Sequence, residues 1–145
     1  MRQVHILALL TGLASCTGEP APHLEFRAQC AASEPGASAV EIQGQRVWFG
    51  PARQFALDAA VAVTDAQGHP AITLILDPAE RAQFEAFTTV TVEGPLGIFL
   101  GGELIAAPAV QSVTTGRFTF CNEAGGWTPA DRDRWIGRIK EGFAP

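Results

Sequence analysis

Side chains that could catalyse a reaction are few in this 145-residue chain, and they form no recognisable set. His69 stands alone in a predicted turn, and Asp131 and Asp133 are only two residues apart, so they cannot share one face of a helix. The chain has no tyrosine, and no serine lies in a nucleophile elbow. The glycine-rich segment 94–102 lacks the Lys-Ser/Thr pair of a phosphate-binding loop. The sequence therefore predicts a protein that is not an enzyme and holds no cofactor.

The three cysteines do suggest chemistry, but not metal binding. Beyond the first 15 residues the only histidines are His23 and His69, and neither lies near a cysteine or another histidine. Structural zinc sites need closely spaced Cys and His ligands. We therefore expect no metal site.

Cys16 ends a segment with the anatomy of a secretory signal. Arg2 gives a positive start, and an apolar run follows that is shorter than the roughly 20 residues needed to span a membrane. The sequence Leu-Ala-Ser-Cys at 13–16 resembles a bacterial lipobox, in which the Cys thiol receives a diacylglyceryl group and the signal is cut before it. The alternative is an ordinary signal with a chance cysteine. Thr17 rather than Asp follows Cys16, which by the enterobacterial sorting rule indicates the outer membrane.

Removal of residues 1–15 leaves a chain long enough for one domain with a real core. Residues 16–23 are expected to form a lipidated, proline-containing tether, and residues 24–145 the folded domain. The formal charge is −5, and loss of Arg2 with the signal makes it about −6. Such a chain repels nucleic acid on average, so no nucleic-acid partner is expected.

Cys30 and Cys121 remain as an even pair in an oxidising compartment, which predicts a disulfide between them. In the chain-entropy model a loop near 100 residues gains about 4.7 kcal/mol from such a bridge. The alternative is a pair of buried thiols.

The hydrophobic pattern predicts an α+β fold, with a mostly antiparallel sheet of five to seven strands and two helices packed on one face. A hairpin is expected over 38–49 with Gly44-Gln45 between its strands, and a second has Gly101-Gly102 as its turn. Residues 57, 59, 61 and 63 alternate as in a half-buried strand, and an apolar strand is expected over 71–76. One helix is expected to begin with Asp77 as its cap, and another near Thr128. A last strand is expected over 117–121. The tryptophans at 48, 127 and 135 are interpreted as core and rim packing, with a ligand groove as the alternative.

Residues 57–121 resemble the head part of the first periplasmic domain of SecD, the translocase-associated membrane protein. The resemblance rests on an ordered series of segments rather than on one motif. The series is the strand 71–76, the helix with Phe84 and Phe87, the segment GPLGIFLGGELIAAP at 94–108, and the Thr-Gly-Arg-Phe segment at 115–118.

This chain also departs from the SecD pattern. Family members usually have an Asn and a basic residue around the glycine that is Gly94 here, whereas this chain has Thr91, Glu93 and Pro95. The usual Asp before the hairpin glycine is replaced by Gly101. The transmembrane helices of SecD have no counterpart in the sequence, so its motor function does not carry over.

The resemblance implies a protein-binding module that contacts exported polypeptide. The candidate binding segment is the hairpin region marked by Gly94, Gly101, Gly102 and Pro108. The expected partners are the membrane, through the lipid, and an envelope or exported protein. The alternatives are a structural or assembly lipoprotein with one fixed partner, and a small-ligand or enzymatic role. A pocket bringing His69 together with two carboxylates would favour the last of these.

Overall fold

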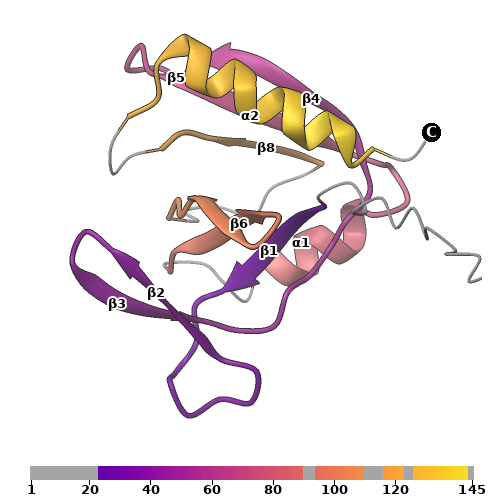
Figure 1. Cartoon of the computed structure of the whole chain (residues 1–145). Helices are drawn as coiled ribbons and strands as arrows, with labels where there is room; N and C mark the ends of the chain where they lie inside the picture. The colour runs from indigo at the N-terminus through magenta and orange to yellow at the C-terminus, as the bar shows by residue number, and fades with distance from the viewer. Residues whose placement is uncertain (1–22, 90–93, 110–115, 123–125, 144–145) are drawn as a thin grey trace, which may run out of the picture.

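The computed structural model describes residues 23–89, 94–109, 116–122 and 126–143 (Figure 1). Cys16 and the predicted signal and lipid attachment site lie outside these residues. The described part has eight strands and two helices, which confirms the α+β class. They are β1 (Leu24–Ala28), β2 (Ser38–Ile42), β3 (Gln45–Phe49), β4 (Leu57–Thr64), β5 (Pro70–Leu76), α1 (Arg81–Thr89), β6 (Leu96–Leu100), β7 (Glu103–Ala106), β8 (Arg117–Phe120) and α2 (Pro129–Glu141). In this part of the chain no helix has the length and hydropathy needed to cross a membrane.

All strand pairs are antiparallel, as predicted, but they form three small sheets instead of one. The orders are β1-β6-β7, β2-β3 and β4-β5-β8. The chain around Gly50-Pro51 explains one of the divisions. Cys30 N donates to Trp48 O at 2.9 Å and Gly50 N donates to Ala28 O at 2.8 Å, so the end of β3 meets the end of β1. Regular pairing stops there and resumes at Arg53, which exchanges two hydrogen bonds of 2.8 Å with Phe26, so isolated bridges connect the two sheets in the described residues.

Two hairpin turns use residues with positive φ. Gly101 and Gly102 have φ of 58° and 82° and join β6 to β7, which confirms the predicted turn. The turn of the β2–β3 hairpin was predicted one residue too late. It consists of Gln43 and Gly44, with φ of 50° and 77°, and Gln45 already pairs with Ile42. Both central residues of a type I′ turn need positive φ, and here glycine takes the second position.

A polar residue that accepts from backbone N–H groups precedes both helices, but only α2 begins where it was predicted. Thr128 caps α2 and forms a capping box with Asp131. Asp77 does not cap α1 directly. Its Oδ1 accepts from Ala79 N at 2.8 Å and its carbonyl accepts from Glu80 N at 2.9 Å, so it stabilises a turn that comes before the helix.

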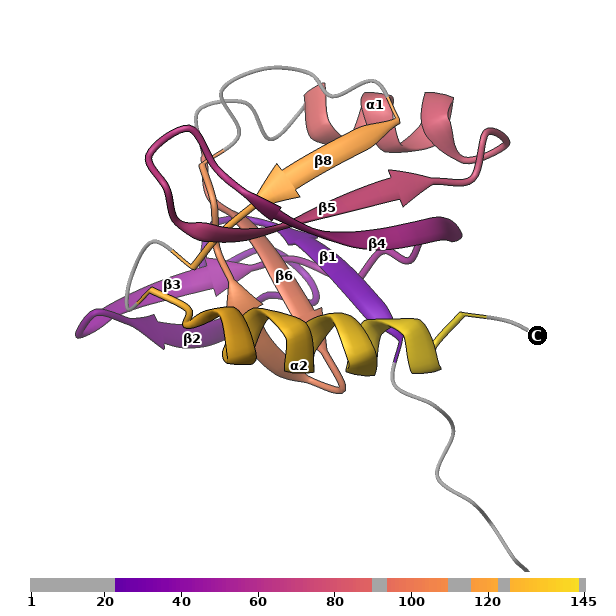
Figure 2. The same ribbon diagram turned by 90° about the horizontal axis from the view of Figure 1, so that it is seen from above.

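The core lies between the β1-β6-β7 and β4-β5-β8 sheets. Both helices bury side chains in it, Phe84 and Phe87 from α1 and Trp135, Ile136 and Ile139 from α2. Figure 2 shows the two helices along opposite edges of the paired sheets. Both bury side chains in the core that also contains Leu74 and Phe118 of the β4-β5-β8 sheet, so they lie on the inner side of that sheet, as predicted, and the β1-β6-β7 sheet shares that side.

The predicted disulfide between Cys30 and Cys121 is absent from the structure. Cys30 follows β1 and Cys121 follows β8, and these strands belong to different sheets. A bridge would have to join these two sheets, and it needs Cα atoms within about 7 Å and side chains that face each other. Burial and, to a lesser degree, the nearby Glu34 carboxylate raise the pKa of the Cys30 thiol.

Gly97 marks the closest packing in β6. The rings of Phe49 and Phe99 meet edge to face with centroids 5.6 Å apart, beside the Gly97 backbone. A Cβ at Gly97 would lie 2.6 Å from Phe99 Cε2 and 2.9 Å from Phe49 Cε1. Both rings are almost fully buried, so they have little room to move.

We expect Gly97→Ala to destabilise the protein by about 1–3 kcal/mol, the usual cost of overpacking a core. Gly137→Ala is the matched control, because a Cβ there meets no atom within 4 Å and alanine favours the helix. Urea unfolding of both variants tests this. A Gly97→Ala midpoint at or above that of the wild type would contradict the packing described.

The α2 cap predicts a pH dependence of stability. Hydrogen bonds from the Thr128 backbone N–H, and then from its hydroxyl, hold the pKa of Asp131 below its ordinary value. A carboxyl with a lowered folded-state pKa adds stability above its unfolded pKa, and this is lost as the pH falls through the folded value.

We therefore expect Asp131→Asn to lower the urea midpoint at pH 7, and the difference between the two proteins to shrink as the pH falls through the lowered pKa of Asp131. Asp58→Asn removes the same charge from an exposed strand position and serves as the control. An equal pH-dependent loss in that control would mean that net charge, not the cap, is responsible.

Candidate functional site

The outer face of the β4-β5-β8 sheet is exposed at Val61 and Thr119. Val61, Thr73 and Thr119 lie in one row across the three strands. The hydroxyl oxygens of the two threonines are 2.7 Å apart, and Val61 is 42% exposed. In Figure 2 the three strands lie nearest the viewer, with both helices to the sides. The row is therefore accessible to a partner as far as the described residues go.

A β-bulge places apolar residues on this open face. Leu57 pairs with Leu76, but Ala59 pairs with Ile75, so Asp58 is an extra residue in β4. A bulge of one residue reverses which side chains face inward. Leu57 and Ala60 consequently face the core, and Ala59, Val61 and Val63 face outward. The sequence alternation at 57, 59, 61 and 63 therefore does not describe one face.

The open face carries almost no charge. The outward residues of the three strands are Ala59, Val61, Val63, Ala71, Thr73, Ile75, Arg117 and Thr119, of which Ala71 is fully buried. Solvent-facing sides of antiparallel sheets are usually polar, and uncharged exposed patches often mark contacts with other proteins. The sequence analysis did not predict this face, although the uncharged runs in β4 and β5 were a usable signal.

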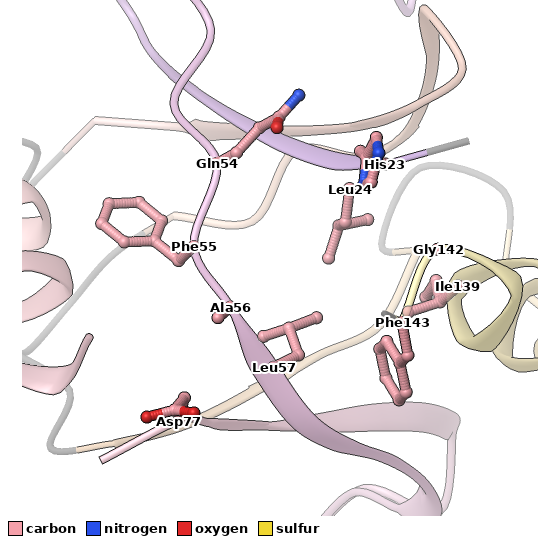
Figure 3. Close-up of a pocket in the computed structure, with 10 residues that line it drawn as sticks. All are labelled: His23, Leu24, Gln54, Phe55, Ala56, Leu57, Asp77, Ile139, Gly142 and Phe143. Carbon is pink, nitrogen blue, oxygen red and sulfur yellow. The ribbon is translucent and has the colours of Figure 1, made fainter. Parts of the chain in front are cut away.

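A hollow of about 430 Å³ lies where the two ends of the described chain meet, and we call it the terminal hollow (Figure 3). It is lined by the start of β1, the segment leading into β4, the residue after β5 and the end of α2. The lining residues are His23, Leu24, Gln54, Phe55, Ala56, Leu57, Asp77, Ile139, Gly142 and Phe143. Sequence reasoning placed His23 in a tether and Asp77 at a helix cap, and it did not bring them together.

A second hollow, of about 480 Å³, lies beside the β4–β5 loop and contains His69. Asp65 Oδ1 accepts from the backbone N of Gln67 and His69 at 2.9 and 2.8 Å, and its Oδ2 lies 3.1 Å from His69 Nδ1. The backbone N–H of His69 is the main reason that the pKa of Asp65 is lowered. Asp65 is the one carboxylate in the lining, so this hollow does not bring His69 to two carboxylates.

The hydrogen bonds between Asp65 and His69 therefore hold the two ends of the β4–β5 loop together. Cys121 and Asn122 line the same hollow. Among the described residues, no group of three or more His, Cys, Asp and Glu side chains is placed to hold a metal ion.

The candidate binding segment around the β6–β7 hairpin is mostly interior. All five residues of β6 are buried, and Pro108 is buried with its carbonyl accepting from Leu96 N at 2.8 Å. Gly94 is half-buried, and the exposed part is the turn Gly101-Gly102. Binding by this segment stays a prediction. The part of the segment that a partner can reach is the Gly101-Gly102 turn.

Two of the three tryptophans pack in the core, as the sequence predicted. Trp127 and Trp135 are buried in the core cluster, and Phe120 meets Trp127 edge to face at 5.8 Å. Trp48 is half-buried on β3.

Comparison with known proteins identifies the fold of this chain. Residues 54–121, just under half of the chain, match the family model of the SecDF P1 head subdomain. No curated protein matches. A solved structure described as "Structure and function of a membrane component SecDF that enhances protein export" superposes with a TM-score of 0.61 at 21% identity, covering 84% of this chain and 63% of the other.

A structure of SecDF in its super-membrane-facing form gives a TM-score of 0.59 at 20% identity, with 84% of this chain and 19% of the other covered. This chain therefore spans less than two thirds of either SecDF chain. The matched segment contains β4, β5 and β8 with their open face. The likeness of this chain to the SecDF P1 head subdomain thus rests on a family-model match over residues 54–121 and on a shared fold.

Proposed function

We propose that this chain is a membrane-anchored periplasmic lipoprotein that acts as a protein-binding module and contacts exported polypeptide. The observation that carries the proposal is the match of residues 54–121 to the P1 head of SecDF, a membrane component described as enhancing protein export. The relationship links the chain to the export machinery. Anchoring and polypeptide binding go further and need their own tests.

The open face of the β4-β5-β8 sheet supports binding of polypeptide. It lies wholly within the matched segment and presents uncharged side chains on adjacent strands. Contact through such a face depends on apolar and backbone groups rather than on particular charges, which suits partners of varied sequence. The hydrogen bonds of Asp65 and His69 also favour a binding role over a catalytic one. Both side chains already serve to stabilise the β4–β5 loop.

The Cys16 signal supports anchoring. Six residues separate Cys16 from His23, where the described chain begins, and the seven steps between these two Cα atoms span at most about 25 Å when extended. The domain would then sit within that distance of the membrane, with the terminal hollow nearest to it. Two or three acyl chains hold a protein firmly, whereas one gives only reversible binding.

We expect Cys16→Ser to abolish incorporation of an alkyne-labelled fatty acid and to move the protein out of the membrane fraction. Cys30→Ser is the matched control and should leave both unchanged. Membrane association that persists in Cys16→Ser without acylation would overturn the lipoprotein assignment. Density separation of inner and outer membranes then tests the destination that Thr17 indicates.

Photo-crosslinking in cells tests the binding role. We expect a photoreactive residue in place of Val61 or Thr119 on the open face to capture many unrelated exported polypeptides, because both positions are exposed. The same substitution at Arg46, which is exposed on β3 outside the matched segment, is the control. Absence of adducts with any envelope or exported protein would contradict the proposal.

A single recurring envelope protein among the adducts would instead favour a structural or assembly lipoprotein with one fixed partner. The β2–β3 ribbon gives this alternative a physical basis. Val40, Ile42 and Val47 are half-buried there but do not belong to the core cluster, and an isolated two-stranded ribbon is only marginally stable in water. A fixed partner could cover these side chains.

A further inference from the structure

The terminal hollow combines an apolar wall with one uncompensated carboxylate. In Figure 3 Leu57 lies between Phe55 and Phe143, and Asp77 lies at the opposite end of the view from Gln54 and His23. Leu24 and Ile139 complete the apolar part of the lining. The size of the hollow, about 430 Å³, is within the range of ligand sites, which are mostly apolar with a few placed polar groups.

The walls of the hollow are fixed by the core and by backbone hydrogen bonds. Phe55 is buried against Phe26 and Phe84, with ring centroids 5.8 and 5.1 Å away. Asp77 N donates to Ala56 O at 3.0 Å, which ties the exit of β5 to the entry of β4. Phe143 N donates to Lys140 O at 3.1 Å at the end of α2. The hollow is therefore formed in advance, which lowers the entropic cost of binding.

Leu57 and Phe143 supply the accessible apolar surface. Both are only partly buried, and both pack against the edge of the core cluster. A bulky apolar side chain placed between them would extend that cluster and lose its own contact with water.

Asp77 gives the hollow its charge preference. The ion pairs among the described side chains do not include Asp77, and its Oδ1 accepts from the Ala79 N–H. The chain as a whole has a formal charge of −5. A cationic group near this carboxylate is attracted both locally and by the overall field. The Gln54 side chain adds an amide that can donate to or accept from a peptide backbone.

We propose that the terminal hollow binds a bulky apolar side chain of an extended polypeptide, with an adjacent Lys or Arg held at Asp77. This inference rests on the proposed function and names a sequence preference for it. A lipid acyl chain would fill the apolar wall but would leave Asp77 without a partner, so the charge at one end of the hollow favours a peptide.

Binding of defined peptides tests the preference. The full lipidated chain is reconstituted in phosphatidylcholine vesicles, and fluorescence anisotropy is measured with Gly/Ser peptides of about ten residues that contain a central Phe-Lys, Ala-Lys or Phe-Glu pair. Empty vesicles correct for binding to lipid. We expect replacement of Phe by Ala to weaken binding about tenfold or more. Replacement of Lys by Glu should weaken it about two- to fivefold or more, with the difference lost at about 1 M salt.

Two variants separate the apolar and charged contributions. Asp77→Asn should remove the preference for Lys over Glu and keep the preference for Phe over Ala. Phe143→Ala should weaken the preference for Phe and keep the preference for Lys. Because each variant retains one preference, unfolding cannot explain the result. Asp58→Asn and Val47→Ala, the latter on β3 outside the hollow and the open face, are the matched charge and apolar controls and should bind as the wild type does.

Equal binding of the Phe and Ala peptides, or an unchanged Lys preference in Asp77→Asn, would overturn the inference. If neither the Phe-Lys nor the Phe-Glu peptide binds, and a fluorescent fatty acid binds saturably and is weakened by Phe143→Ala, the hollow is a lipid site instead. If the peptides fail but Val61 and Thr119 still crosslink to exported polypeptides, the proposed function stands and only the hollow assignment fails. Failure of both would remove the proposed function as well.

Discussion

The burial of Phe84 is the contact on which the rest of the structure depends. Its ring meets Phe26 of β1, Phe55 of the segment before β4, and Phe118 of β8, with centroid distances of 5.3, 5.1 and 6.0 Å. One side chain of α1 therefore holds two sheets and a connecting segment together. The edge-to-face geometry adds to the burial of apolar area, and loss of this ring would open a cavity shared by all three partners.

The same cluster connects the core to the candidate binding surfaces. Phe55 faces Phe84 on one side and lines the terminal hollow as well, so the core positions the wall of the hollow. Phe118 packs inward from β8 and fixes which side chains of that strand face outward, because neighbouring residues of a strand point to opposite sides. Thr119 is exposed for this reason. Both surfaces thus follow from the packing of aromatic residues that are not themselves accessible.

Local features of the fold could be predicted from the sequence, and long-range features could not. The Gly101-Gly102 turn, the inward Phe118 and Phe120, and the Thr128 cap are each determined by residues close together in the chain. The division into three sheets depends on which strands pair, and the predicted Cys30–Cys121 disulfide depended on the placement of β1 and β8, which lie in different sheets. Asp58 shows the limit most clearly, because one bulge residue exchanges the faces of β4, and its effect appears only once β4 is paired with β5. The terminal hollow was missed because its lining comes from four separate segments.

The bulge at Asp58 also relates the two candidate surfaces. Leu57, before the bulge, faces the core and lines the terminal hollow, while Val61, after it, faces outward on the open sheet. A regular strand would have placed both side chains on one face, and β4 would then have served either the hollow or the open face. With the bulge, one strand contributes a side chain to both surfaces.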